Sequence, residues 1–342
     1  MRAIRVARHG DLDALELVDV DEPRPGPHEV LVEMTAVALN HLDVWVRKGV
    51  PGHAFPLPLI PCSDGSGRVL EVGNGVRGLD VGDEIFVLPG VSDARGAATL
   101  RGEDHLDPSY RILGEACDGL ARERVVLSAE NVHGKPSRLS MVEAAAFPLS
   151  FLTAWNMVVR RARVRAGETV LVQAGASGVG VAAIQICNLL GARVIATAGS
   201  AAKCARLDEL GVVEAIRYDE VDVVEAVRRI APNGVEVVVD HVGSATFGDS
   251  MRCLARAGRY VTCGATTGTK VDVHLGHVFF KSLSILGSTM GRRGDLITIA
   301  KLMDQGRLVP IVGAVLDGLE AMRDGHRLLE RREVFGKVVI RL

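Results

Sequence analysis

Hydrophobic and polar positions follow two different patterns along the 342-residue chain. Up to about residue 129, short runs rich in Val, Ile and Leu are bounded by glycine, proline and aspartate, which is typical of strands in a compact β domain. The clearest runs are EVLVEMTAVAL (29–39), GSGRVLEVG (65–73) and GDEIFVLPG (82–90). No long helix is expected in this part of the chain.

From Ser140 onward the pattern changes to helical spacing. Ser140 is a good N-cap, Glu143 follows three residues later, and apolar residues recur through 140–162, which predicts one helix. Beyond it the pattern predicts strands at 169–174, 193–198, 235–243, 259–265 and 283–289, and helices at 178–191, 200–211 and 244–258. Such Val/Ile/Leu strands between helices indicate a parallel sheet covered on both faces. The last fifty residues are expected to end in a helix (319–333) and a strand (336–342).

Length, composition and charge narrow the class of protein. A chain of 342 residues is too long for one comfortable core and suggests two domains. No apolar run approaches the ~20 residues of a membrane span, and a formal net charge of −2 without a basic cluster gives no footprint for nucleic acid. The N-terminus lacks the features of a secretory signal. We expect a cytoplasmic protein with a small-molecule partner.

The six cysteines are scattered and include no C-x-x-C pair. Their spacing therefore indicates neither a zinc cluster nor a disulfide framework. We interpret them as small buried hydrophobic residues in a reducing compartment. A further role for Cys62 stays open because it begins the segment CSDGSGRVLEVGNGV (62–76).

A glycine-rich turn, AGASGVG (174–180), follows the predicted strand 169–174. Its spacing is G-x-S-x-x-G, with Ser177 where the middle glycine of a dinucleotide-binding turn usually lies. A tight turn without a ligand would show the same pattern, but the preceding strand and following apolar helix favour dinucleotide binding. The predicted diphosphate-binding residues are Gly175, Ser177, Gly178, Val179 and Gly180.

The end of the second strand, 193–198, bears on which dinucleotide is bound. NAD enzymes usually keep an acidic residue there for the ribose 2′-hydroxyl, but here Gly199, Ser200 and Lys203 follow, and the nearest acid is Asp208 in the next helix. Ser200 and Lys203 match a 2′-phosphate, so NADP(H) is predicted. A plain N-cap serine and a solvent-facing lysine remain the alternative.

The segments NHLD (40–43), CSDGSGRVLEVGNGV (62–76) and AGASGVG (174–180) occur in an order that resembles the medium-chain dehydrogenase/reductase superfamily over essentially the full length. Within it, the chain is similar to the zinc-lacking quinone oxidoreductase-like branch. The resemblance implies an α/β protein with a GroES-like β-rich catalytic domain at 1–145, completed by 291–342. It also implies a Rossmann domain with a doubly wound parallel sheet at 146–290.

The same resemblance indicates that the zinc sites are lost. The catalytic ligands of zinc alcohol dehydrogenases match Asn40, Ser63 and Leu149, and the four structural cysteines match Asp93, Gly96, Thr99 and Asp107. The proton-relay positions match Leu42 and Trp45. None of these catalytic positions offers a thiolate or imidazole, so no metal is predicted, and a solvated loop is expected at 93–107.

Without a Lewis acid, hydride transfer to an activated acceptor is easier than oxidation of a simple alcohol. We therefore predict NADPH-dependent reduction of a quinone, enone or enoyl thioester, as the resemblance also implies. Asn40 is expected at the nicotinamide ribose or substrate carbonyl, although it could merely cap the following helix. His41 is the candidate proton donor, and an ordinary surface or core-edge histidine without a catalytic role is the alternative. Ser63, at a position matched to a zinc ligand, is the third candidate catalytic residue.

The resemblance adds further cofactor contacts at Thr153, Tyr218, Gly243, Gly264 and Lys337. It also implies a homodimer or homotetramer in which the strand at 283–290 lies at the sheet edge and pairs across a two-fold axis. Two other functions stay open, an atypical alcohol dehydrogenase and a non-catalytic NADPH-binding protein.

Overall fold

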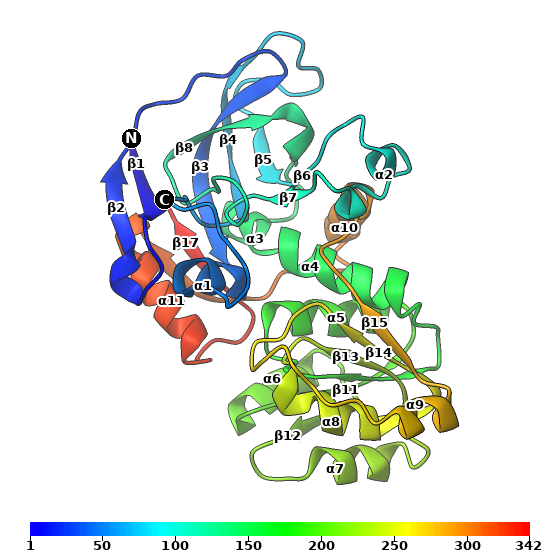
Figure 1. Ribbon diagram of the computed structural model, residues 1–342. Helices are drawn as coiled ribbons and strands as arrows, with labels where there is room; N and C mark the ends of the chain where they lie inside the picture. The colour runs from blue at the N-terminus through cyan, green and yellow to red at the C-terminus, as the bar shows by residue number, and fades with distance from the viewer. The chain divides into compact units, whose positions relative to one another are not determined.

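The computed structural model describes residues 1–342 and divides into two compact units. The first unit comprises Met1–Ser150 and Arg292–Leu342, and the second comprises Phe151–Gly291 (Figure 1). The chain passes from the first unit to the second within helix α4 (Pro148–Trp155) and has returned to the first by α10 (Arg293–Asp304). None of the helices combines the length and apolar character that crossing a membrane requires.

The first unit is built on a seven-stranded mixed sheet in the order β16-β17-β3-β4-β5-β9, with β8 also paired to β3. Its strands are β3 (Glu29–Leu39), β4 (Asp64–Val72), β5 (Glu84–Val87), β8 (Arg124–Ser128), β9 (Val132–Gly134), β16 (Val312–Asp317) and β17 (Lys337–Arg341). Two small antiparallel pairs accompany it, β1 (Arg2–Val6) with β2 (Leu15–Asp19) and β6 (Gly90–Val91) with β7 (Arg111–Ile112). Its helices are α1 (His41–Lys48), α2 (Ala97–Leu100), α3 (Met141–Ala146), α10 and α11 (Met322–Glu330).

Strand β3 is central because it pairs with β17, β4 and β8. Its first half alternates between buried and less buried residues, whereas its last four residues are all buried. Small side chains explain this burial, since Ala36 and Ala38 pack against Ala145 and Ala146 of α3 and let the helix approach closely. The carboxyl end of β3 therefore lies in the core of the unit, directly before α1.

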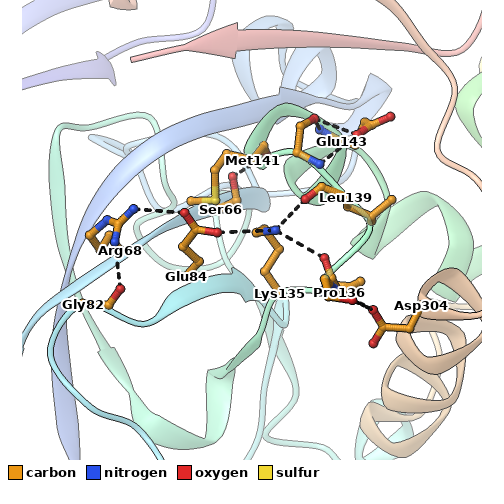
Figure 2. Close-up of polar contacts among 12 residues, drawn as sticks. Ser66, Arg68, Gly82, Glu84, Lys135, Pro136, Leu139, Met141, Glu143 and Asp304 are labelled. Atoms are coloured by element: carbon orange, nitrogen blue, oxygen red, sulfur yellow. Dashed lines mark hydrogen bonds and ion pairs between the residues drawn. The ribbon is translucent and has the colours of Figure 1, made fainter.

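A polar network attaches α3 to this sheet (Figure 2). The Ser66 hydroxyl on β4 donates to the Met141 carbonyl oxygen at 2.6 Å, and Ser140 and Glu143 form the predicted capping box at the start of α3. The Lys135 ammonium lies 3.4 Å from Glu84 on β5 and donates to the Leu139 carbonyl oxygen. These contacts hold the chain in place just before it reaches α4.

The second unit contains a six-stranded, fully parallel sheet in the order β12-β11-β10-β13-β14-β15. Its strands are β10 (Thr169–Val172), β11 (Arg193–Ala198), β12 (Glu214–Arg217), β13 (Val235–Asp240), β14 (Leu254–Thr262) and β15 (Ser284–Gly287). The helices are α5 (Gly178–Leu189), α6 (Ala201–Glu209), α7 (Val223–Ile230), α8 (Ser244–Cys253) and α9 (Leu275–Lys281), with α5 and α8 on opposite faces (Figure 1). This doubly wound sheet and the β-rich first unit confirm the predicted fold class.

The single helix predicted for 140–162 is wrong. The structure has α3, a break at Phe147, then α4, which begins at Pro148 and continues into a π-helical turn at Asn156–Arg161. Proline has no N–H to donate and its ring crowds the preceding turn, so it begins a helix more readily than it continues one. The predicted helix 244–258 also ends early, at Cys253, because β14 begins at Leu254.

Candidate functional site

Three polar residues meet at one end of three adjacent strands in the first unit. Asn40 directly follows β3, Asp64 begins β4 and Lys337 begins β17. In the sheet register Ala38 pairs with Asp64, and Leu39 pairs with Val338, so residues from distant parts of the sequence are brought side by side.

These three side chains bind one another in the core. The Lys337 ammonium lies 2.5 Å from Asn40 Oδ1 and 2.9 Å from Asp64 Oδ2, and Asn40 Nδ2 donates to the same Asp64 oxygen at 2.9 Å. The Leu149 N–H donates to Asp64 Oδ1 at 2.7 Å. Asp64 is fully buried and the other two are nearly so. The ammonium thus neutralises a buried carboxylate, and together they orient the Asn40 carboxamide.

Asp43 connects this cluster to the chain around Cys62. Its carboxylate accepts from the N–H of Asn40 at 2.7 Å and from the N–H of Cys62 at 2.9 Å. Burial raises the pKa of Asp43 to about 6, although the two backbone donors work in the opposite direction. Burial also raises the pKa of the Cys62 thiol well above its ordinary value. Asn40 is also the N-cap of α1, where it forms a capping box with Asp43, so its expected role at the start of this helix and its place in the buried cluster occur together.

Asn40, Ser63 and Leu149, at the positions matched to the catalytic zinc ligands, do not fit a zinc ion. Leu149 has no donor atom, and the Asn40 carboxamide is already bound to a carboxylate and an ammonium. Ser63 is fully buried, and its hydroxyl has no hydrogen-bond partner. Nowhere in the chain do three His, Cys, Asp or Glu side chains gather closely enough to hold a metal. The ammonium of Lys337 supplies a positive charge within this buried cluster.

His41 lies outside the buried cluster. It is the first residue of α1 and is exposed, and its ring is edge-on to that of Trp45 with centroids 6.1 Å apart. Surrounding protein atoms partly desolvate the imidazole and, with the Arg332 guanidinium, lower the pKa of His41. Its neutral form is therefore favoured more than in an ordinary surface histidine.

The loop at the vacated structural zinc positions is organised by Asp107. This carboxylate is buried and accepts hydrogen bonds from the N–H of Ala98 and from both the N–H and the hydroxyl of Ser109. The Ser109 hydrogen bonds lower the pKa of Asp107. A Cβ at Gly96 would lie 2.1 Å from Asp107 Oδ2, so a side chain there would displace this carboxylate. Much of the segment is exposed, as expected of a solvated loop, and hydrogen bonds to the Asp107 carboxylate organise it.

In the second unit, the glycine-rich turn joins β10 to α5. Ser177 is the N-cap of α5 and accepts from the N–H of Gly180 at 2.9 Å. A Cβ at Gly180 would lie 2.4 Å from the Ala174 carbonyl oxygen, and one at Gly175 would lie 2.9 Å from the Cβ of Ala196. Glycine is needed at both positions because helix and strand approach so closely. The predicted residues Gly175, Ser177, Gly178, Val179 and Gly180 lie together at this helix start, where N–H groups favour an anion.

The ends of β11 and β12 bring together the residues predicted to select the dinucleotide. Ser200 is the N-cap of α6, and its hydroxyl accepts from the N–H of Lys203 at 3.3 Å. The exposed Tyr218 follows β12, and a Cβ at Gly199 would lie 2.4 Å from its hydroxyl. The carboxylate of Asp219 pairs with Arg217. No acidic residue lies directly at the end of β11.

Three further predicted cofactor residues lie in the same unit. Two are close to the end of a helix or strand, and the third lies inside a helix. Gly243 is the N-cap of α8 and has a positive φ of 98°, which favours glycine, and Gly264 lies two residues after the end of β14. Thr153 is buried within α4.

Two contacts were missed by sequence reasoning. The pairing of Lys337 with Asp64 joins residues 273 positions apart, and His241 contacts Ser177 across two strands. The position of His241 near the end of the predicted strand 235–243 was the available signal.

The β-rich unit, the doubly wound sheet and the glycine turn define a two-domain oxidoreductase of the nucleotide-cofactor type. Two family models match, described as alcohol dehydrogenase GroES-like domain over residues 26–137 and zinc-binding dehydrogenase over residues 178–305. The chain belongs to the medium-chain dehydrogenase/reductase superfamily. The second matched range contains none of the three vacated catalytic zinc positions.

Proteins with several different activities in their names are similar to this chain. Quinone oxidoreductase-like protein 2 from Bos taurus is 31% identical, over 100% of this chain and 93% of that protein. Acryloyl-coenzyme A reductase from Metallosphaera sedula is 29% identical, over 99% of each chain. A crystal structure of an NAD-dependent alcohol dehydrogenase has a TM-score of 0.96 at 49% identity and covers 100% of both chains.

Proposed function

We propose that the protein is a zinc-independent, NADPH-dependent reductase whose acceptor is a quinone, an enone or an enoyl thioester. The observation that carries this proposal is the buried Asn40–Asp64–Lys337 cluster, which includes Asn40 at a position matched to a zinc ligand of related enzymes. An activated double bond conjugated to a carbonyl accepts hydride without prior removal of an alcohol proton. Such a substrate therefore suits a pocket that offers hydrogen-bond donors and no metal ligands.

Bound NADPH supplies the hydride. Addition of hydride to the β-carbon moves negative charge to the carbonyl oxygen, which then needs a donor. The Ser63 hydroxyl is buried and has no partner, so it can donate to that oxygen without losing another hydrogen bond. Asp64 and Lys337 hold the Asn40 carboxamide in one orientation. His41, after taking a proton from solvent, is the proton source for the reduced product.

The preference for NADPH is supported by the chemistry at the end of β11. No carboxylate is present there to repel a 2′-phosphate, while Ser200 and Lys203 follow Gly199 in the chain and the Tyr218 hydroxyl lies beside Gly199. Lys203 supplies a positive charge within the first turn of α6. A second cofactor, NADH, is tested alongside because a structurally similar alcohol dehydrogenase is described as NAD-dependent.

An alcohol dehydrogenase is the second candidate function. It is favoured by 49% identity to a protein of that description over the whole chain. The two functions differ in what they need, because oxidation of a simple alcohol requires a group that lowers the alcohol's pKa. Dependence on a metal and the direction of the reaction therefore distinguish them.

The test is an acceptor screen on chelator-washed protein. Purified protein is analysed for zinc, then incubated with EDTA, and NADPH and NADH oxidation is followed with quinones, enones and enoyl thioesters. We expect no stoichiometric zinc, retained activity in EDTA, and turnover with at least one acceptor class. A bound zinc whose removal abolishes turnover would refute the proposal. Turnover only with alcohols would support the second candidate, and failure with every acceptor and alcohol would favour a non-catalytic binding protein.

We also propose that the protein forms a homodimer or homotetramer through the second unit. Strand β15 is at the edge of the sheet, and Ile285 on it is 44% exposed. On α9, Leu275, Phe279 and Phe280 are each more than 60% exposed, an apolar surface of the kind that partners cover. Light scattering at micromolar concentration should give a dimer or tetramer, and Phe280→Asp should shift it toward monomer. A monodisperse wild-type monomer would overturn the proposal.

A further inference from the structure

His241 lies at the point in the second unit where the strand order reverses. The sheet runs β12-β11-β10-β13, so the chain builds outward from β10 in one direction and from β13 in the other. Ligands of open α/β sheets bind beyond the carboxyl ends of the strands at such a point. Ser177 comes in the turn after β10, and His241 directly follows β13. Their side chains meet there, with 2.8 Å between Ser177 Oγ and His241 Nε2, and neither residue is fully buried.

The hydrogen bonds of Ser177 depend on the charge of His241. Ser177 Oγ already accepts from the N–H of Gly180, which leaves one proton to donate and one further lone pair. When Nε2 of the imidazole is unprotonated, it accepts the hydroxyl proton of Ser177. When the ring is an imidazolium, Nε2 donates to Ser177 Oγ and the hydroxyl proton turns elsewhere. Protonation therefore adds a positive charge and frees an O–H donor at the start of α5.

Few ionisable groups lie in the segments around this pair. The turn 173–180 contains none. Asp240 precedes His241, but its buried carboxylate accepts from the N–H of Val242 and from the hydroxyls of Thr246 and Ser250. The segment after β14 carries Cys263, whose pKa burial raises to about 12, together with Lys270, Asp272 and His274, and α8 carries Asp249 and Arg252. His241 is the group among these that contacts Ser177 directly, and the ordinary pKa of a histidine lies near neutrality.

We propose that His241 belongs to the diphosphate site of the dinucleotide, and that the cofactor binds together with one proton taken from solvent by His241. This inference rests on the dinucleotide binding of the proposed function. A diphosphate held by the N–H groups at the start of α5 would lie beside the imidazole, favour its charged form and raise its pKa. The added affinity is fully present below the pKa of the free protein's His241, and is lost as the pH rises through the higher pKa of the complex.

The experiment measures binding to the full chain and needs no turnover. NADH is titrated from pH 5.5 to pH 8.5 by nicotinamide fluorescence, because the 2′-phosphate of NADPH itself titrates near pH 6. Calorimetry at pH 6.5 in two buffers of different protonation enthalpy counts the protons taken up. The test variant is His241→Gln, whose amide can still bond to Ser177 but does not titrate in this range. The matched control is His277→Gln, an exposed histidine on α9.

We expect the Kd of the wild type and of His277→Gln to rise about tenfold across this range, which corresponds to a pKa change of one unit. The Kd of His241→Gln should be nearly independent of pH, with no net proton uptake and an unchanged melting temperature. The same slope in His241→Gln, or no slope in the wild type, would overturn the inference while leaving dinucleotide binding intact. Absence of binding by both NADH and NADPH at every pH would instead refute the cofactor assignment, and the inference with it.

Discussion

The cluster around Asp64 and the turn after β10 are organised in different ways. At Asp64, charged and polar side chains are buried and held by one another, with Lys337 almost fully enclosed. At the turn, the backbone itself forms the site, and Gly175 and Gly180 are small because a neighbouring chain leaves no room for a side chain. The first arrangement depends on charge pairing inside the core, and the second on the close approach of main chains. Substitutions should therefore change stability through charge pairing at Asp64 and through steric overlap at the turn.

The largest effect is expected from breaking the buried ion pair. Lys337→Met leaves the Asp64 carboxylate without its cation, and a buried charge that loses its partner destabilises a protein by about 3–5 kcal/mol. The measurement is urea unfolding at neutral pH. Adding Asp64→Asn to this variant should recover part of the loss, because it removes the unpaired charge. The control Lys48→Met, at a half-exposed pair with Glu330, should change stability by less than about 1 kcal/mol. Equal losses for the two lysines would contradict the role given to burial.

The next effect comes from the glycine turn. Gly180→Ala places a Cβ 2.4 Å from the backbone oxygen of Ala174, so the helix or the turn must shift. Overpacking of this kind destabilises by about 1–3 kcal/mol, and dinucleotide affinity should fall with it. Gly248→Ala is the matched helical control, since a Cβ there meets nothing within 4 Å. It should be neutral or slightly stabilising. A neutral Gly180→Ala would show that the turn is less constrained than its contacts indicate.

A smaller, pH-dependent effect is expected at Asp43. Burial raises its pKa to about 6, so the folded protein binds this proton more tightly than the unfolded chain does. The corresponding stability is present below the unfolded pKa and is lost as the pH rises through about 6. Relative to Asp43→Asn, the wild type should gain about 1–1.5 kcal/mol when the pH falls from 7.5 to 5. Denaturant unfolding of both proteins measures this gain, and a pH-independent difference would argue against a buried, protonatable Asp43.

The smallest expected effect is at the adenosine end of the second unit. Lys203→Ala removes one positive charge near Gly199, so KM for NADPH should rise about tenfold while KM for NADH stays nearly unchanged. Initial rates with both cofactors provide the measurement, with Lys301→Ala on α10 as a surface control. A wild type that prefers NADH, or equal weakening of both cofactors, would refute a 2′-phosphate site at this position.

Local patterns were enough to indicate most of the fold. The change from short β runs to alternating strands and helices predicted a β-rich unit and a parallel sheet, and the structure confirms both. The glycine spacing indicated the turn, because close approach of α5 to β10 constrains neighbouring residues that are adjacent in the sequence. The prediction of a continuous helix through Pro148 was wrong, because apolar periodicity does not register that proline lacks the N–H needed to continue a helix.

What the sequence by itself determined about this protein is the order of its elements, the absence of metal-ligand residue types at Asn40, Ser63 and Leu149, and the turn at 174–180. Only the tertiary structure decided which polar groups are partners. Lys337 reaches Asp64 and Asn40 because β17 and β4 lie on either side of β3, and His241 reaches Ser177 because β13 lies beside β10. The physical reason is that strand pairing brings together residues far apart in the chain. Burial then determines which of their charges and protons persist.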